Sequence, residues 1–479
     1  MALLCGCRLG PDYQKPQEPT TTAWQWTPAE PKDEFPKGPW WELYEDPKLN
    51  ELEEQAILAN PNLRSVVASV DGARAQVIFA RGAFFPDLSA TGSAVRESTS
   101  GNQPLPISGI TGITPSSITT PLYTATANVS FEIDLWGAIR RGLESAQANL
   151  ESNIALYQNA LLTLQAEVAS QYFLLRVADA ETRLLKEAVK LLTDNLNLVR
   201  TQYRAGLTDD LAVAQAESLQ CSTIAQLDDK QRQRETFQNA LAVLCGQPAC
   251  NFSISPAYIV STPFEVPPGL PSTLLERRPD VAASERALAS TCAQIGIAYA
   301  NFFPNVSLTG QFGYLSTQTQ NFISSSSQLW SFGPAVTLPI FQGGQLVANL
   351  KSAKAVYEGS LASYQATVIQ AFSDVQTALS DVHYYKDQWF SQNKAAVAAQ
   401  RAATLSKLQY ERGLVSYLQV VDADRTAINT NIAALDLVGA RFLASVQLIK
   451  TLGGGWSVAE LNNANAPTIV FRTNPATGP

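Results

Sequence analysis

The chain has 479 residues, of which 46% are hydrophobic and 16% are charged, and its formal net charge is −8. This composition is typical of a folded protein and argues against intrinsic disorder. An acidic chain offers no basic surface for phosphates, so nucleic acid is not an expected partner. The sequence contains no run of about 18 apolar residues, so it does not predict a membrane-spanning α-helix. The remaining classes are soluble proteins and membrane proteins built from β-strands.

The N-terminus has a pattern typical of a bacterial lipoprotein cleavage site. Leu4 and two small residues precede Cys7, which would become the acylated first residue of the mature chain. Such a lipid attaches a protein to a membrane without spanning it. The alternative is a cysteine that stands near the start by coincidence. From Arg8 to Pro39 the chain is rich in Pro and Thr, which predicts an extended arm.

The remaining cysteines and the single histidine do not suggest chemistry. Their spacing resembles no metal site, and no nucleophile triad or phosphate loop is present, so we expect no enzyme, no metal and no cofactor. Cys245 and Cys250 enclose the short turn sequence GQPA. This pair is either a disulfide or two free thiols, and the sequence leaves both alternatives open.

An internal repeat organises most of the chain. The segment 60–92 aligns with 278–310 at an offset of 218 residues, and the later matches, such as Gly137 with Gly344, have an offset of 207. A tandem duplication explains both offsets if the first copy has a longer loop after Gly92. We therefore expect a lipoprotein start and arm at 1–45, a first repeat at 46–260, a second repeat at 261–455 and a tail at 456–479. The first repeat would have a strand pair at about 86–135 and a helical hairpin at about 138–245. The second would have a strand pair at about 304–341 and a helical hairpin at about 345–452.

Strict alternation of apolar and polar residues predicts four strands. In the segment 123–135, YTATANVSFEIDL, the odd positions are apolar and the even positions are polar, which is the period of a strand with two different faces. The segments 88–94, 306–314 and 330–340 repeat the pattern. A soluble sandwich is one interpretation. Strands of about 10 residues with aromatic residues toward one end favour membrane strands instead.

Each strand pair is followed by a long segment without proline that predicts a helical hairpin. The helix from Ala138 to Tyr203 has 66 residues and would be roughly 100 Å long. A Gly-Leu pair interrupts the helical pattern in both repeats, and glycine is the residue that ends a helix in a left-handed turn. Gly206-Leu207 and Gly413-Leu414 are therefore the predicted hairpin tips.

Four amphipathic strands cannot close a barrel, and lipid does not tolerate an open sheet edge, so copies of the chain must assemble. Two chains would supply eight strands and three would supply twelve, of which only the larger number leaves room for a channel. The polar strand positions would line it: Thr124, Thr126, Asn128, Ser307, Thr309 and Gln311.

Six motifs give the chain a specific resemblance: CRLGPDYQKP, WWELYEDPKLNEL, FFPDLS, FEIDLWGAIRR, ERRPDVAASE and NFFPNVSLTG. The chain resembles the TolC-like outer membrane factor family, especially its NodT-type lipoprotein branch, from Cys7 to about Gly454. The resemblance implies an α+β membrane protein that forms a homotrimer. Its 12-stranded β-barrel would continue into a long α-helical coiled-coil barrel with a mixed equatorial belt.

The resemblance also implies a function without catalysis or cofactor. The trimer would be the outer membrane channel of a tripartite efflux system and a passive exit duct for small molecules. Its partners would be outer membrane lipid, a periplasmic adaptor and an inner-membrane pump of the RND type. The protein would be lipid-anchored in the bacterial outer membrane, with a large periplasmic portion. The alternative is a type I secretion duct, which has the same architecture and carries polypeptides.

Positions that match the family's gate lie at the second tip. By resemblance, Leu418 and Asp422 form the inward-pointing periplasmic constriction, and Tyr410 and Arg412 make the helix contacts that hold it shut. Gln419 stands where some members have a second acidic ring, which departs from the double acidic gate. Three carboxylates that converge on an axis repel one another and attract cations, so an Asp422 ring would be both selective and easily opened.

By the same resemblance, the two tip loops are the surfaces that dock the adaptor. The residues concerned are Gly206 and Leu207 in the first repeat and Gly413 and Leu414 in the second.

Overall fold

The computed structural model describes residues 8–16, 39–98, 100, 119–259, 263, 278–454 and 456. Cys7 therefore lies outside the described residues. The chain divides into two compact units, and each takes segments from both repeats. The strand unit comprises Met1–Lys15, Asp71–Leu150 and Arg286–Ala362, and the hairpin unit comprises Pro16–Val70, Glu151–Glu285 and Ser363–Pro479.

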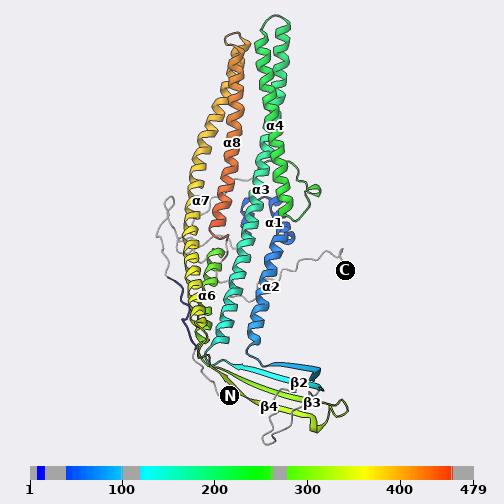
Figure 1. The fold of residues 1–479 in the computed structure, drawn as a ribbon. Coiled ribbons are helices and arrows are strands. Elements are labelled where there is room, and N and C mark those ends of the chain that lie inside the picture. The colour runs from blue at the N-terminus through cyan, green and yellow to red at the C-terminus, as the bar shows by residue number, and fades with distance from the viewer. Residues whose placement is uncertain are drawn as a thin grey trace. The chain divides into compact units, whose positions relative to one another are not determined.

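The strand unit contains the four predicted strands as one antiparallel sheet in the order β1-β2-β3-β4 (Figure 1). Strand β4 ends at Thr337, earlier than the predicted end at Ile340, because Pro339 has no N–H to donate to a ladder. The bounds are β1 Asp87–Ser98, β2 Thr119–Ile133, β3 Asn305–Ser316 and β4 Gln328–Thr337.

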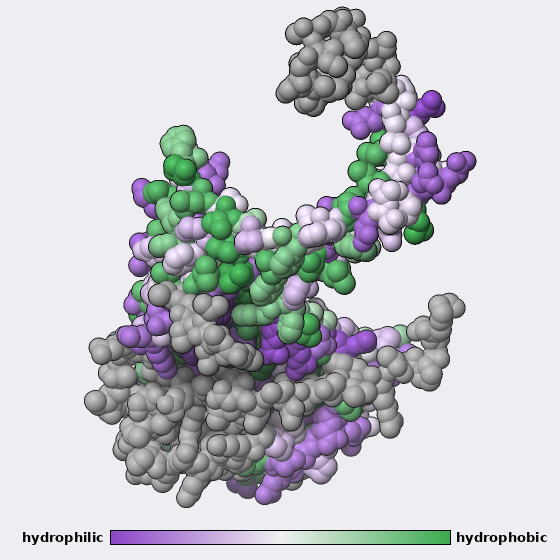
Figure 2. All heavy atoms as spheres, turned by 90° about the horizontal axis from the view of Figure 1, so that it is seen from below, coloured by the Kyte–Doolittle hydropathy of each residue, from purple (hydrophilic) through white to green (hydrophobic). Residues whose placement is uncertain are grey.

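The register of the sheet confirms the two predicted faces. Asn128 lies opposite Gln311, whereas Phe131 lies opposite Leu308. Because directly opposed residues point to the same side of a sheet, polar residues collect on one face and apolar residues on the other. Thr91 and Thr126 join β1 to β2 on the polar face, with 2.9 Å between their hydroxyl oxygens. Figure 2 views the molecule from below and shows green hydrophobic side chains exposed beside purple hydrophilic ones.

The helices of the two predicted repeats have equal lengths. Helices α3 and α7 have 67 residues each, and α4 and α8 have 35 residues each. A duplication predicts equal lengths because each copy retains the same pattern of apolar positions and turns. The α-helices are α1 Pro47–Ala59, α2 Pro61–Gly82, α3 Ala138–Arg204, α4 Asp210–Leu244, α6 Pro279–Ala300, α7 Gln345–Glu411 and α8 Tyr417–Thr451, and the short 3₁₀ helices are η1 Trp40–Tyr44, η2 Ala249–Asn251 and η3 Ser325–Ser327.

A cluster of aromatic rings forms part of the core of the hairpin unit. The ring centroids of Tyr44 and Phe173 are 4.9 Å apart, and the rings of Phe173 and Phe442 stack at 4.3 Å. The hydroxyl oxygens of Tyr44 and Ser445 are 2.7 Å apart and share a hydrogen bond. The cluster therefore joins η1, α3 and α8 by both apolar contact and a satisfied buried hydroxyl.

Helix α8 is long and apolar enough to cross a membrane, judged by length and composition alone. However, 44% of its most apolar window is buried inside the protein. Side chains such as Phe442, Val446 and Ile449 are fully or almost fully buried. The C-terminal part of α8 therefore packs in the core of the hairpin unit.

Cys245 and Cys250 are both free thiols, so the structure does not contain the disulfide considered from the sequence. The Cys245 thiol is buried and donates to the Leu52 carbonyl oxygen at 3.7 Å, whereas Cys250 is exposed. The helix end and turn between the two cysteines direct one side chain inward and the other outward. Burial raises the pKa of the Cys245 thiol to about 11, which leaves it protonated and unreactive.

Candidate functional site

The first hairpin tip closes through a left-handed glycine. Gly206 has φ +73°, and its N–H donates to the Tyr203 carbonyl at 2.9 Å. The N–H of Leu207 donates to the Gln202 carbonyl, also at 2.9 Å. These two bonds are those of a Schellman motif, which satisfies the last carbonyl groups of α3. The Asp209 carboxylate then accepts from the N–H of Ala212 at 3.0 Å and caps α4.

The second tip has the same geometry. Gly413 has φ +71°, and the N–H groups of Gly413 and Leu414 donate to the Tyr410 and Gln409 carbonyls at 2.9 and 3.0 Å. No heavy atom lies within 4 Å of where a Cβ on Gly413 would stand, so its backbone conformation is what favours glycine here. Both predicted tips are therefore confirmed as turns.

Each tip presents a leucine to solvent. Leu207 is 78% exposed and Leu414 is 70% exposed. Both follow the left-handed glycine, so the side chain stands beyond the last helical turn. The two repeats therefore expose equivalent apolar side chains at the ends of their hairpins.

The two faces of the first turns of α8 differ in environment. Tyr417, Val420 and Val421 are buried against apolar residues of α3 and α4. Leu418 and Asp422 lie four residues apart, which places them on one side of the helix, and both are exposed. The two predicted constriction residues are thus together, on an exposed face of α8. The buried partners are Leu192, Leu196 and Val199 on α3 and Ala212, Ala216 and Leu219 on α4.

Tyr410 makes a contact between the two hairpins. Its hydroxyl donates to the Gln202 Oε1 at 2.9 Å, and its ring lies 5.2 Å from the ring of Tyr417. Nearby, the Lys407 Nζ donates to the Asn195 Oδ1 at 3.0 Å. These two bonds tie α7 to α3 near the tips.

Arg412, the other residue predicted to hold the gate, lies on the tip itself. Its side chain is exposed, and its N–H donates to the Gln409 carbonyl at 3.2 Å as part of the turn. The structure therefore brings Tyr410 into the seam between the hairpins and keeps Arg412 at its surface.

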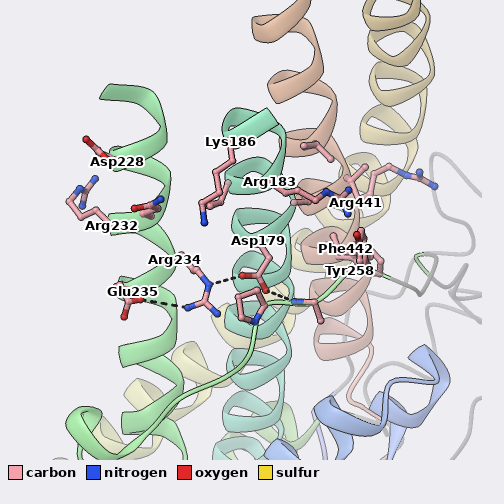
Figure 3. A pocket seen from close by; sticks show the side chains of 18 of the residues that line it. Asp179, Arg183, Lys186, Asp228, Arg232, Arg234, Glu235, Tyr258, Arg441 and Phe442 are labelled. Carbon is pink, nitrogen blue, oxygen red and sulfur yellow. Dashed lines mark hydrogen bonds and ion pairs between the residues drawn. The ribbon is translucent and has the colours of Figure 1, made fainter. Parts of the chain in front are cut away.

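Sequence reasoning missed a charged cluster deeper in the hairpin unit. Figure 3 shows the Asp179 carboxylate, which accepts from the Arg234 Nε at 2.6 Å and from the Ala257 N–H at 3.2 Å. Arg176 also pairs with Asp179 at 3.0 Å, and Arg234 donates to the Ile254 carbonyl at 2.6 Å. The cluster holds the segment after η2 against α3 and α4. It lies beside an open cavity of about 1280 Å³.

A second charged cluster joins three helices. The Lys230 Nζ on α4 lies 2.8 Å from the Glu181 Oε1 on α3 and 3.6 Å from the Asp436 Oδ1 on α8. Burial raises the pKa of Glu181 to about 7, although the Lys230 ammonium opposes this shift. The sequence could have predicted this cluster from charged residues that stand at otherwise apolar positions of the helical pattern.

Within the residues that the structure describes, no group of three or more His, Cys, Asp or Glu side chains could hold a metal ion. The notable features are instead two hairpin tips with exposed leucines, an exposed Leu-Asp face on α8 and a sheet with one polar and one apolar face. These features define a channel protein that combines membrane strands with long helical hairpins.

The sequence model of the outer membrane efflux protein family matches residues 52–247 and 270–454. The chain therefore belongs to this family. It is 32% identical over 461 residues to the probable efflux pump outer membrane protein TtgC of Pseudomonas putida. The aligned residues cover 95% of this chain and 94% of TtgC. It is 30% identical over 460 residues to the cation efflux system protein CusC of Escherichia coli O6:H1, covering 95% and 96% of the two chains.

The fold matches solved structures equally well. The outer-membrane channel OprN superimposes with a TM-score of 0.85 and 30% identity, over 94% of this chain and 100% of that one. Members of the family are trimeric outer membrane channels that work with an adaptor and an inner-membrane pump. This chain is accordingly a non-enzymatic outer membrane channel subunit of a tripartite efflux system. Four strands from each of three chains supply the twelve strands of the barrel.

Proposed function

We propose that the trimer is a passive exit duct for small molecules and that its periplasmic end closes at the second tip. The observation that carries this proposal is the exposed pair Leu418 and Asp422 on α8, opposite a face buried against the first hairpin. A threefold axis brings three copies of such a pair together. Both side chains of the pair are exposed, so the pair is available for that contact.

The two residues have different tasks in the closed state. A ring of three Leu418 side chains forms an apolar constriction that resists wetting, and a ring of three Asp422 carboxylates attracts cations and repels itself. Tyr410 restrains the gate through its 2.9 Å hydrogen bond to Gln202, because opening must move α7 and α8 away from α3. Arg412 is exposed and available to a neighbouring subunit.

The further assignments concern partners and anchoring. The tips Gly206-Leu207 and Gly413-Leu414 dock the periplasmic adaptor, which is supported by their exposure and matched geometry. The cognate pump is of the RND type, as the resemblance to the NodT-type branch implies. Cys7 is acylated and anchors the chain in outer membrane lipid, supported by the cleavage pattern before it. The relatives named above are efflux components, so a secretion duct has no support.

Conductance in planar bilayers tests the gate. The double variant Leu418→Ala with Asp422→Ala removes both rings, and we expect its single-channel conductance to rise several-fold. The matched control is Leu211→Ala with Gln215→Ala, the equivalent positions on α4, which should leave conductance near that of the unchanged protein. Equal conductance of the gate variant and the unchanged trimer would refute the assignment.

Crosslinking tests the docking tips. A photoreactive residue at Leu207 or Leu414 should capture the adaptor in cells, whereas one at the exposed Val243, far from the turn along α4, should not. Capture from position 243 alone would place the docking surface elsewhere.

A further inference from the structure

The first described residues of the N-terminal arm are clamped by one buried arginine. The Arg141 side chain is 1% exposed, and its guanidinium donates to the carbonyls of Leu9 and Gly10 at 3.2 and 3.3 Å. It also pairs with Asp12 at 2.9 Å and Glu144 at 2.9 Å. Five-donor guanidinium geometry suits such a set of acceptors, so the arm is held in one place in the strand unit.

The arm also approaches α6 closely. Gly10 has φ +87°, and a Cβ there would lie 2.5 Å from the Gly296 Cα, so both positions need glycine. The N–H of Leu9 donates to the Trp136 carbonyl at 3.2 Å. The Cys292 thiol donates to the Pro11 carbonyl at 3.8 Å. The backbone of the arm is therefore fixed on two sides.

The clamped arm forms one wall of a cavity of about 640 Å³ within the strand unit. Ile295, Tyr299 and Phe303 form a second wall from α6 and its exit, and Tyr357 on α7 contributes a third ring. Among the described residues that line the cavity, the charged ones are Lys354 and Glu358, which are exposed. The Lys354 Nζ lies 5.3 Å from the centre of the Tyr299 ring. The lining is thus apolar and aromatic with a charged rim, which suits a lipid chain.

The cavity lies at the junction between α6 and β3. Phe303 lines it two residues before β3 begins at Asn305. The Trp136 ring lies 4.8 Å from the Phe303 ring, and its Nε1 donates to the Pro304 carbonyl at 2.7 Å. Since the helices are periplasmic and the strands cross the membrane, this end of β3 marks the inner surface of the outer membrane.

We propose that this cavity holds a fatty acyl chain of the lipid attached to Cys7, an inference that rests on the proposed lipidation. Cys7 precedes Leu9 by two residues, so no more than about 7 Å of backbone separates the acylated residue from the cavity wall. Arg141 and the close approach of Gly10 to Gly296 fix that wall. The clamp therefore delivers the lipid to an apolar site at membrane level.

Photocrosslinking of the full-length protein in native membranes tests the proposal. Cells are fed palmitate that bears a diazirine, illuminated, and the trimer is digested for mass spectrometry. We expect the acylated N-terminal peptide joined to peptides that contain Tyr299 or Tyr357. The variant Cys7→Ser, with the same feeding, should lose both the acyl mass and these crosslinks.

The other outcomes overturn the proposal in distinguishable ways. An N-terminal peptide without acyl mass removes the proposed lipidation and the inference with it. Acyl mass on Cys7 with crosslinks only to phospholipid or to strand residues leaves the anchor intact and places its chains in the bilayer. Crosslinks to the Tyr299 and Tyr357 peptides that persist in Cys7→Ser would assign the cavity to a free membrane phospholipid.

Discussion

The buried Glu53 provides a direct test of the packing in the hairpin unit. Its side chain lies on α1 and is fully buried, and neither carboxyl oxygen has a hydrogen-bond partner among the described residues. Burial raises the pKa of Glu53 well above its ordinary value, because the charged carboxylate loses its hydration there. The variant Glu53→Met replaces the carboxyl with an apolar side chain of similar length. We expect the free energy of unfolding to rise by about 1–3 kcal/mol at pH 7, the cost of an unsatisfied buried polar group.

The pH dependence of this effect has a definite sign. In the unfolded chain Glu53 ionises near its ordinary pKa of 4.5, whereas in the folded chain it keeps its proton to a higher pH. Between these two pKa values the unfolded state binds fewer protons, so stability falls as the pH rises. Methionine does not titrate. The advantage of Glu53→Met should therefore be smallest at or below pH 4.5 and should grow as the pH rises above it.

Urea unfolding of the detergent-solubilised protein, followed by far-ultraviolet circular dichroism at pH 5 and pH 8, measures both effects. The matched control is Glu54→Met, because Glu54 is the next residue and is exposed. It should change the free energy of unfolding by less than about 0.5 kcal/mol at either pH. Destabilisation by Glu53→Met would show that the carboxyl has a partner. A gain that is the same at both pH values would show that burial does not shift the Glu53 pKa, and either result would refute the reasoning.

Two further predictions concern the second tip and the three-helix cluster. Gly413→Ala should lower the free energy of unfolding by about 1–2 kcal/mol, because alanine is strained at φ +71°, whereas Gly359→Ala inside α7 should raise it by about 0.5–1 kcal/mol. Denaturant titration compares the two, and equal signs would contradict the turn geometry. Lys230→Met should lower the free energy of unfolding by about 2 kcal/mol at pH 8, because it leaves an ionised, buried Glu181 unpaired. The loss should be smaller at pH 5.5, because this pH lies below the Glu181 pKa of about 7. Thermal unfolding at both pH values measures this, and a loss that does not depend on pH would argue against the ion pair.

Much of the fold follows from local rules that a sequence displays directly. The period of two in the segment 123–135 predicts the strand and also its faces, and the register shows Asn128 and Phe131 on the expected sides. The two Gly-Leu pairs predict the tips because a left-handed turn at a helix end depends on one residue's backbone freedom. The equal lengths of the helices in the two repeats follow from the duplication. These features need no knowledge of distant contacts.

The sequence by itself thus determined the repeats, the strand faces, the hairpin tips and, through resemblance, the family. Only the tertiary structure decided which charged residues are buried. Glu53 and Glu54 are adjacent and identical, yet one is buried and the other exposed. Besides the nearby Glu144, Arg141 has acceptors on Leu9, Gly10 and Asp12, which lie 129 to 132 residues away along the chain. Such pairings depend on how separate elements pack against one another, and the periodicity of one helix or strand does not predict which other element packs against it.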